Sequence, residues 1–107
     1  MKPAKGGYMR ISDFLPAGAN HAVTAKELKT FLHMTERELS QRIRSERLDG
    51  IPICSRTHTD ADGKAGYFMP ATADDFTATI RQLKAREREI MTVRIAMEKA
   101  YNTRYGK

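Results

Sequence analysis

The sequence is poor in the residues that mark several common classes of protein. It has no tryptophan, a single cysteine (Cys54) and no apolar run near the ~20 residues that span a bilayer. A single cysteine cannot form an internal disulfide, which excludes a small domain held together by such bonds. The first seven residues are basic, and no apolar stretch follows them, so they do not form a signal peptide. We therefore expect a cytoplasmic protein with no membrane partner.

Side chains in the patterns needed for catalysis or metal binding are also scarce. The three histidines are isolated from one another, and one cysteine does not complete a zinc site. The acidic stretch at 60–63 lacks the further oxygen ligands of a calcium loop and is typical of a polar turn. There is no glycine-rich phosphate loop and no pairing of a nucleophile with a base. We expect no enzyme activity, no metal or other cofactor, and no small-molecule substrate.

Positive charge is in excess. The 107 residues carry a formal net charge of +6, with 40% hydrophobic and 30% charged residues. Such a composition is typical of one soluble domain with a modest core. A basic surface favours an anionic partner, most commonly nucleic acid, although many basic proteins bind none.

The strongest pattern is a sequence motif that occurs twice, at Val23–Leu28 and at Met34–Leu39. Each copy places threonine at a helix N-cap and glutamate three residues later, with apolar residues before the cap and at the fourth helical position. This combination is a capping box with a hydrophobic staple. The first helix therefore covers only 24–32 before a turn at His33. Two short helices joined so tightly predict a helix-turn-helix. The apolar face of the first helix comprises Leu28, Phe31 and Leu32.

The second of these helices should run over 35–48 and end at Asp49-Gly50. At 3.6 residues per turn, one face presents Leu39 and Ile43, and the opposite face is basic. That opposite face carries Arg37, Gln41 and Arg44. Arginine can form a bidentate pair with guanine, and glutamine with adenine, so we expect these three residues to read DNA bases. The alternative is an ordinary solvated helix face.

Two β-rich segments, 51–55 and 65–69, enclose a polar stretch and predict a hairpin. A hairpin directly after the second helix is typical of a winged helix-turn-helix. A short helix at 11–15, capped by Ser12, should precede the pair. The expected fold class is mainly α with a minor β component. It comprises a flexible basic tail at 1–10, a winged helix-turn-helix at 11–70 and a long helix at 71–107.

Seven further residues are expected to hold the DNA backbone or contact DNA from the wing. They belong to the start of the second helix, to the helix before it and to the wing. Solvated surface charges are the alternative interpretation for the lysines and for the wing residues. The seven are Thr35, Ser40, Lys26, Lys29, Arg56, His58 and Lys64.

Residues 71–107 should form one long helix capped by Thr72. Its apolar residues follow a 4-3 spacing as far as Tyr101, and the last of them have nothing in their own chain to pack against. We therefore expect a homodimer, or a partner protein, at Ile90, Met97 and Tyr101. Glu87 and Arg94 interrupt this seam, which weakens the coiled-coil interpretation unless they pair across an antiparallel dimer.

Four blocks of the sequence, followed by a long charged helix, resemble small winged helix-turn-helix DNA-binding proteins of bacterial prophages and phages. The blocks are Ile11–Pro16, Ala22–Leu28, Gly50–Ile53 and Gly66–Pro70, and the resemblance extends to about Met91. It implies a winged-helix fold and a DNA-binding role. The expected function is therefore a sequence-specific double-stranded DNA-binding protein that regulates transcription.

Two alternatives stay open. In one, the domain is a winged-helix protein-interaction module in phage replication or recombination, and the long helix binds the partner. In the other, the protein has an architectural, excisionase-like role and bends DNA with little reading of bases.

Overall fold

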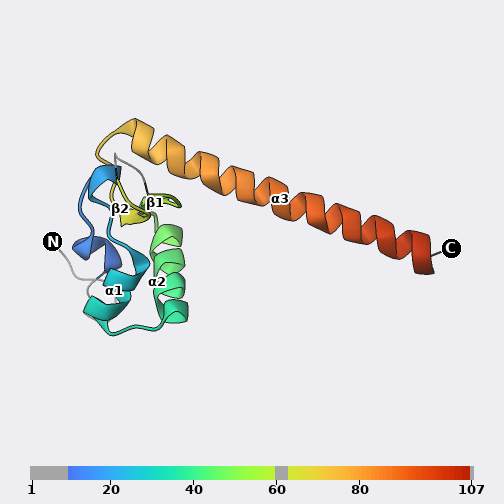
Figure 1. Cartoon of the computed structure of the whole chain (residues 1–107), viewed down its shortest axis with the longest axis horizontal. Coiled ribbons are helices and arrows are strands. Elements are labelled where there is room, and N and C mark those ends of the chain that lie inside the picture. Colours follow the sequence, from blue (N-terminus) through green and yellow to red (C-terminus); the bar gives the residue numbers. More distant parts are fainter. Residues whose placement is uncertain (1–9, 60–62, 107) are drawn as a thin grey trace. The chain divides into compact units, whose positions relative to one another are not determined.

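The computed structural model describes residues 10–59 and 63–106 and is mainly helical, with one two-stranded antiparallel sheet (Figure 1). The mainly-α expectation with a minor β component is confirmed. The expected basic tail, apart from Arg10, and the acidic positions 60–62 lie outside the described residues. Along the chain the elements are η2 (Ile11–Phe14), η3 (Ala19–His21), α1 (Ala25–Leu32), α2 (Glu36–Leu48), β1 (Cys54–Arg56), β2 (Gly66–Phe68) and α3 (Ala73–Tyr105).

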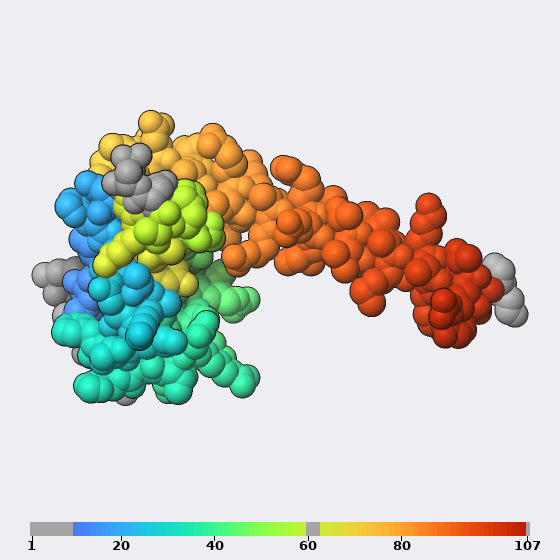
Figure 2. All heavy atoms as spheres, in the orientation of Figure 1, coloured from blue at the N-terminus to red at the C-terminus, as the bar shows by residue number. Residues whose placement is uncertain are grey.

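The chain divides into two units, the first ending at Phe76 and the second beginning at Thr77. The first unit contains the short elements, whose side chains pack closely together in Figure 2. The second unit is the remainder of α3. Each unit is described by itself below.

Both capping boxes predicted from the repeated sequence motif are present. The Thr24 hydroxyl accepts the Glu27 N–H at 3.0 Å, and the Glu27 carboxylate accepts the Thr24 N–H at 2.9 Å. Thr35 and Glu38 repeat the exchange at 3.1 and 2.8 Å. Because the first N–H groups of a helix have no partner within it, these exchanges fix where α1 and α2 begin.

A left-handed residue makes the turn between α1 and α2. His33 has φ 56° and ψ 49°, and the Met34 N–H donates to the Lys29 carbonyl at 3.0 Å. A left-handed residue at this position ends a helix and reverses the chain direction. The turn predicted at His33 is therefore confirmed.

The inner face of α2 forms the centre of the first unit. Leu39 and Ile43 are buried, as the helical spacing predicts. Four buried apolar residues from other segments join them: Ile11, Leu15, Leu28 and Ile53. Phe31, expected on the apolar face of α1, is instead 65% exposed and packs edge-on against Phe14, with ring centroids 5.4 Å apart.

A buried carboxylate joins α2 to the N-terminal segment. Glu46 is only 5% exposed, and its side chain accepts the Ile11 N–H at 2.6 Å and the Ser12 N–H at 3.1 Å. The predicted cap at Ser12 is wrong, because η2 begins at Ile11 and its N-cap is Arg10, two residues before Ser12. The first two N–H groups of η2, those of Ile11 and Ser12, bond to a glutamate 35 and 34 residues away in sequence.

The hairpin forms, but β1 starts later than predicted. Cys54 pairs with Phe68, and Arg56 with Gly66. The preceding residues are not extended, because the Ile53 N–H bonds back to the Ile51 carbonyl at 2.8 Å. This tight turn leads the chain out of α2 before pairing begins.

A third segment pairs with β2 on its other side. Val23 and Tyr67 exchange two backbone hydrogen bonds, of 2.9 and 2.8 Å, just before α1 begins. Gly66 permits this approach because it has φ 149°, and a Cβ there would overlap the Val23 carbonyl. The entry to α1 and the hairpin are therefore held together.

The long C-terminal helix is continuous, as the sequence predicts. Thr72 accepts the Asp75 N–H at 3.2 Å, and the Asp75 carboxylate accepts the Ala71 N–H at 2.9 Å. From this start α3 covers 33 residues, or about 50 Å. None of the helices in the described ranges combines the length and the apolarity needed to cross a membrane.

We predict that Glu46→Ala destabilises the first unit by about 2–4 kcal/mol, because it leaves two backbone N–H groups without their acceptor. Urea unfolding followed by circular dichroism measures the change. Glu36→Ala is the matched control: that side chain is 78% exposed, and its loss should cost less than about 0.5 kcal/mol. Equal losses in the two variants would contradict the role of the buried carboxylate.

Candidate nucleic-acid interface

The four arginines of α2 fall into two groups, and two of them serve the fold. The Arg42 guanidinium lies 3.7 Å from the Glu46 carboxylate. Arg47 donates to the Ile53 carbonyl at 3.0 Å and to the Ser55 hydroxyl at 3.4 Å. Both residues are half-buried. Arg42 pairs with a carboxylate of its own helix, and Arg47 bonds α2 to the segment that enters β1.

The other two arginines lie on the solvent side of the helix. Arg37, Gln41 and Arg44 are exposed, and none of their side chains forms a hydrogen bond or ion pair with the residues at 10–59 or 63–106. Ser40 is exposed at the edge of this face. The structure therefore brings together the three side chains that the sequence assigns to base reading.

Leu48 belongs to the same face, although the sequence analysis gave it no role. It is 71% exposed at the last position of α2. The spacing from Arg37 through Gln41 and Arg44 to Leu48 is four, three and four residues, which keeps all of them on one side of a helix. That spacing was the available signal. We call these four residues the outer face of α2.

The start of α2 is acidic, but each of its carboxylates has a partner. Glu36 pairs with Lys29 at 3.4 Å, and Glu38 belongs to the Thr35 capping box. The Thr35 hydroxyl oxygen accepts a backbone N–H, which leaves its own proton as the group that could reach a phosphate. Of the two lysines expected near the turn, Lys26 is exposed and Lys29 is held by Glu36.

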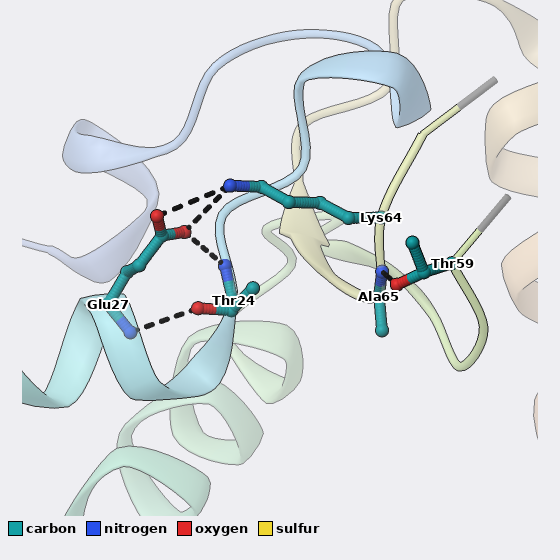
Figure 3. Close-up of polar contacts among 5 residues, drawn as sticks. All are labelled: Thr24, Glu27, Thr59, Lys64 and Ala65. Atoms are coloured by element: carbon teal, nitrogen blue, oxygen red, sulfur yellow. Dashed lines mark hydrogen bonds and ion pairs between the residues drawn. The ribbon is translucent and has the colours of Figure 1, made fainter. Parts of the chain in front are cut away.

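In the predicted wing, Lys64 lies against the start of α1 (Figure 3). Its ammonium donates to both oxygens of Glu27, at 3.1 and 3.2 Å. In the loop beside it, the Ala65 N–H donates to the Thr59 hydroxyl at 3.0 Å. Lys64 therefore adds an ion pair to the capping box at the start of α1.

The other two predicted wing residues are neighbours. The Arg56 Nε donates to the His58 carbonyl at 3.2 Å, so the arginine shapes the loop that follows β1. The His58 side chain is exposed. These two residues belong to the hairpin segment and not to α2, so they are not part of its outer face.

The structure lowers the pKa of the Glu27 carboxyl. The hydrogen bond from the Thr24 N–H lowers its pKa, and the Lys64 ammonium and the Thr24 hydroxyl lower it further. The charged carboxylate thus stabilises the start of α1. Because the folded-state pKa is lowered, this stabilisation is present above the ordinary glutamate pKa and is lost as the pH falls through the folded value.

In the second unit, Ile90, Met97 and Tyr101 are exposed. The Tyr101 ring lies 5.1 Å from that of Tyr105. In the part of the chain that the structure describes, no three histidine, cysteine or acidic side chains are grouped as a metal site would need. Cys54 is buried.

Comparisons with models of protein families, with curated proteins and with solved structures give no match to this chain.

We predict that Glu27 titrates below the ordinary glutamate pKa and that Lys64→Met raises its midpoint only in part. The Thr24 N–H, the largest cause of the lowered value, is unchanged in that variant. NMR titration of the Glu27 carboxyl carbon measures the midpoint, with Lys26→Met as the control for loss of an exposed lysine on α1. An unchanged midpoint in Lys64→Met would mean that the ion pair is absent in solution.

Proposed function

We propose that the first unit is a winged helix-turn-helix that binds double-stranded DNA with sequence specificity. In this proposal α1 and α2 are the two helices of the motif, and α2 enters the major groove. The hairpin β1–β2, with Val23 paired to its second strand, is the wing. The arrangement supports this because a tight left-handed turn joins two capped helices and the hairpin follows directly.

The division of the α2 arginines is the observation that carries the proposal. Arg42 and Arg47 are used within the fold, whereas Arg37 and Arg44 lie with Gln41 on the solvent side. A solvated face needs no such separation. A recognition helix does, because its inner polar groups must hold it rigid and its outer ones must be available to the bases.

Each residue of the outer face has a matching group on a base edge. Arg37 and Arg44 can donate two hydrogen bonds to guanine, and the Gln41 amide can both donate to and accept from adenine. Leu48 can make an apolar contact with a thymine methyl group. Each bidentate pair contributes about 1–3 kcal/mol of discrimination against a wrong base.

The remaining predicted residues would hold the sugar-phosphate backbone. Ser40 and Lys26 are exposed and can contact phosphate directly. Arg56 and His58 would do so from the wing, whereas Lys29 and Lys64 would first have to exchange their glutamate partners for phosphates. This exchange makes the two lysines weaker contributors, and the net charge of +6 adds attraction that falls with salt.

Biologically, the proposal is a regulator of transcription of the prophage type that acts as a homodimer through α3. The exposed apolar residues of α3 also favour a second candidate, a module whose function is to bind another protein in phage replication or recombination. An architectural, DNA-bending role differs from regulation in one measurable respect, since it needs little discrimination between sequences.

We predict that Arg44→Ala weakens binding to a preferred duplex by about 5- to 150-fold while weakening binding to a scrambled duplex much less. The preferred duplex is obtained by repeated selection from a random pool, and fluorescence anisotropy measures affinity at ~50–200 mM salt. Arg81→Ala, which removes an exposed arginine of α3, is the matched control and should leave the ratio of the two affinities unchanged.

Each other outcome points elsewhere. Equal weakening for both duplexes would assign Arg44 to phosphate. If selection enriches no sequence although DNA binds, the architectural role replaces regulation. If no DNA binds, the DNA proposal is wrong and the protein-binding candidate remains.

A further inference from the structure

We propose that the second half of α3 pairs with the same helix of a second copy in antiparallel orientation. In this pairing Glu87 of each copy lies beside Arg104 of the other. The inference rests on the self-pairing part of the proposed function and does not depend on DNA binding.

The second half of α3 has an apolar surface too large for a single solvated helix. Between positions 90 and 105, seven large apolar side chains are exposed: Ile90, Met91, Val93, Ile95, Met97, Tyr101 and Tyr105. Most helices in proteins owe their stability to packing of such a face. Polar residues all round would suit a lone helix, and this segment does not have them.

Two columns of residues, each repeating every seven positions, form the seam of this surface. The first column is Ile80, Glu87, Arg94 and Tyr101, and the second is Leu83, Ile90, Met97 and Arg104. Columns that alternate at spacings of three and four residues are those that meet in a two-helix coiled coil. Three charged residues therefore fall where a partner helix would contact them.

A parallel pair would bring like charges together. In-register parallel helices oppose each column to itself, so Glu87 would face Glu87, and Arg94 and Arg104 would each face their own copies. Three layers of the seam would then be repulsive. Like charges a few ångströms apart are unfavourable, most of all where partner side chains exclude water.

An antiparallel pair opposes one column to the other and removes all three clashes. With the helices centred between Ile95 and Ala96, Tyr101 faces Ile90 of the second copy and Met97 faces Arg94. Arg104 then faces Glu87, so opposite charges meet at both ends of the paired segment. Shifting one helix by seven residues loses this match: in one direction Glu87 faces Met97, and in the other Arg94 faces Arg104.

The charge at the centre of the seam is already balanced. The Arg94 guanidinium lies 3.0 Å from the Glu98 carboxylate of its own helix, one turn further along. Its aliphatic stem can therefore pack on Met97 of the second copy while its charged end stays at the solvent edge. Val93 and Ala100 flank the seam on one side, and antiparallel pairing places them opposite each other.

Charge reversal at the two ends tests the orientation. Glu87→Arg and Arg104→Glu should each raise the dimer dissociation constant roughly tenfold, because each places like charges together twice per dimer. The double variant Glu87→Arg/Arg104→Glu should return it close to the original value. Glu89→Arg, an exposed position off the seam, is the control for reversing a charge on α3. Sedimentation equilibrium of the full chain gives the constants, and circular dichroism checks the helix content.

Parallel pairing predicts a different pattern, since each single reversal would exchange one like-charge pair for another and leave dimerisation unchanged. That result, or a chain that stays monomeric at high concentration, overturns the proposal. A disulfide that forms between two Ile90→Cys chains more readily than between Ile90→Cys and Tyr101→Cys chains overturns it as well. DNA binding is measured separately, so its failure leaves these readouts intact.

Discussion

The first unit depends on the two hydrogen bonds that the buried Glu46 carboxylate accepts from the N-terminal segment. This carboxylate lies on the inner face of α2 and accepts two backbone N–H groups, with Arg42 beside it. A charge buried to 5% exposure is tolerated only when hydrogen bonds replace its water, and here they come from a segment 34–35 residues away. One side chain therefore positions η2 against α2.

This contact helps to determine which polar side chains of α2 bond within the fold and which face solvent. Arg42 lies beside the buried carboxylate, and Arg47, five residues further along, donates to the carbonyl of Ile53 at the entry to the hairpin. Polar bonds thus fix the rotation of the helix about its own axis, in addition to the burial of Leu39 and Ile43. Once that rotation is fixed, Arg37, Gln41 and Arg44 must face outward. In our proposal the DNA-reading surface is a consequence of how the opposite face is anchored.

The sequence predicts those structural features that depend on residues close together in the chain. The capping boxes at Thr24 and Thr35 act over three residues, so the starts of α1 and α2 and the turn between them could be predicted. The partner of Glu46 could not, because no local pattern relates it to Ile11. β1 was predicted too early because residues 51–53 favour a strand, whereas the Ile53 N–H bonds back to the Ile51 carbonyl and strand pairing begins only at Cys54. Leu48 was overlooked because an apolar residue is ordinarily expected to be buried, although its spacing from Arg44 places it on the outer face of α2.

In the proposed pairing of two copies through α3, affinity and orientation have separate origins. Apolar residues such as Ile90 and Met97 favour burial against almost any apolar partner and do not distinguish one helix direction from the other. The charged residues of the seam add little net stability, but they are costly when wrongly paired. Glu87 and Arg94 weaken a simple coiled-coil interpretation of the sequence. In our proposal these two residues and Arg104 specify an antiparallel second copy. The same charged residues that interrupt the apolar seam would thus select one orientation of the second copy.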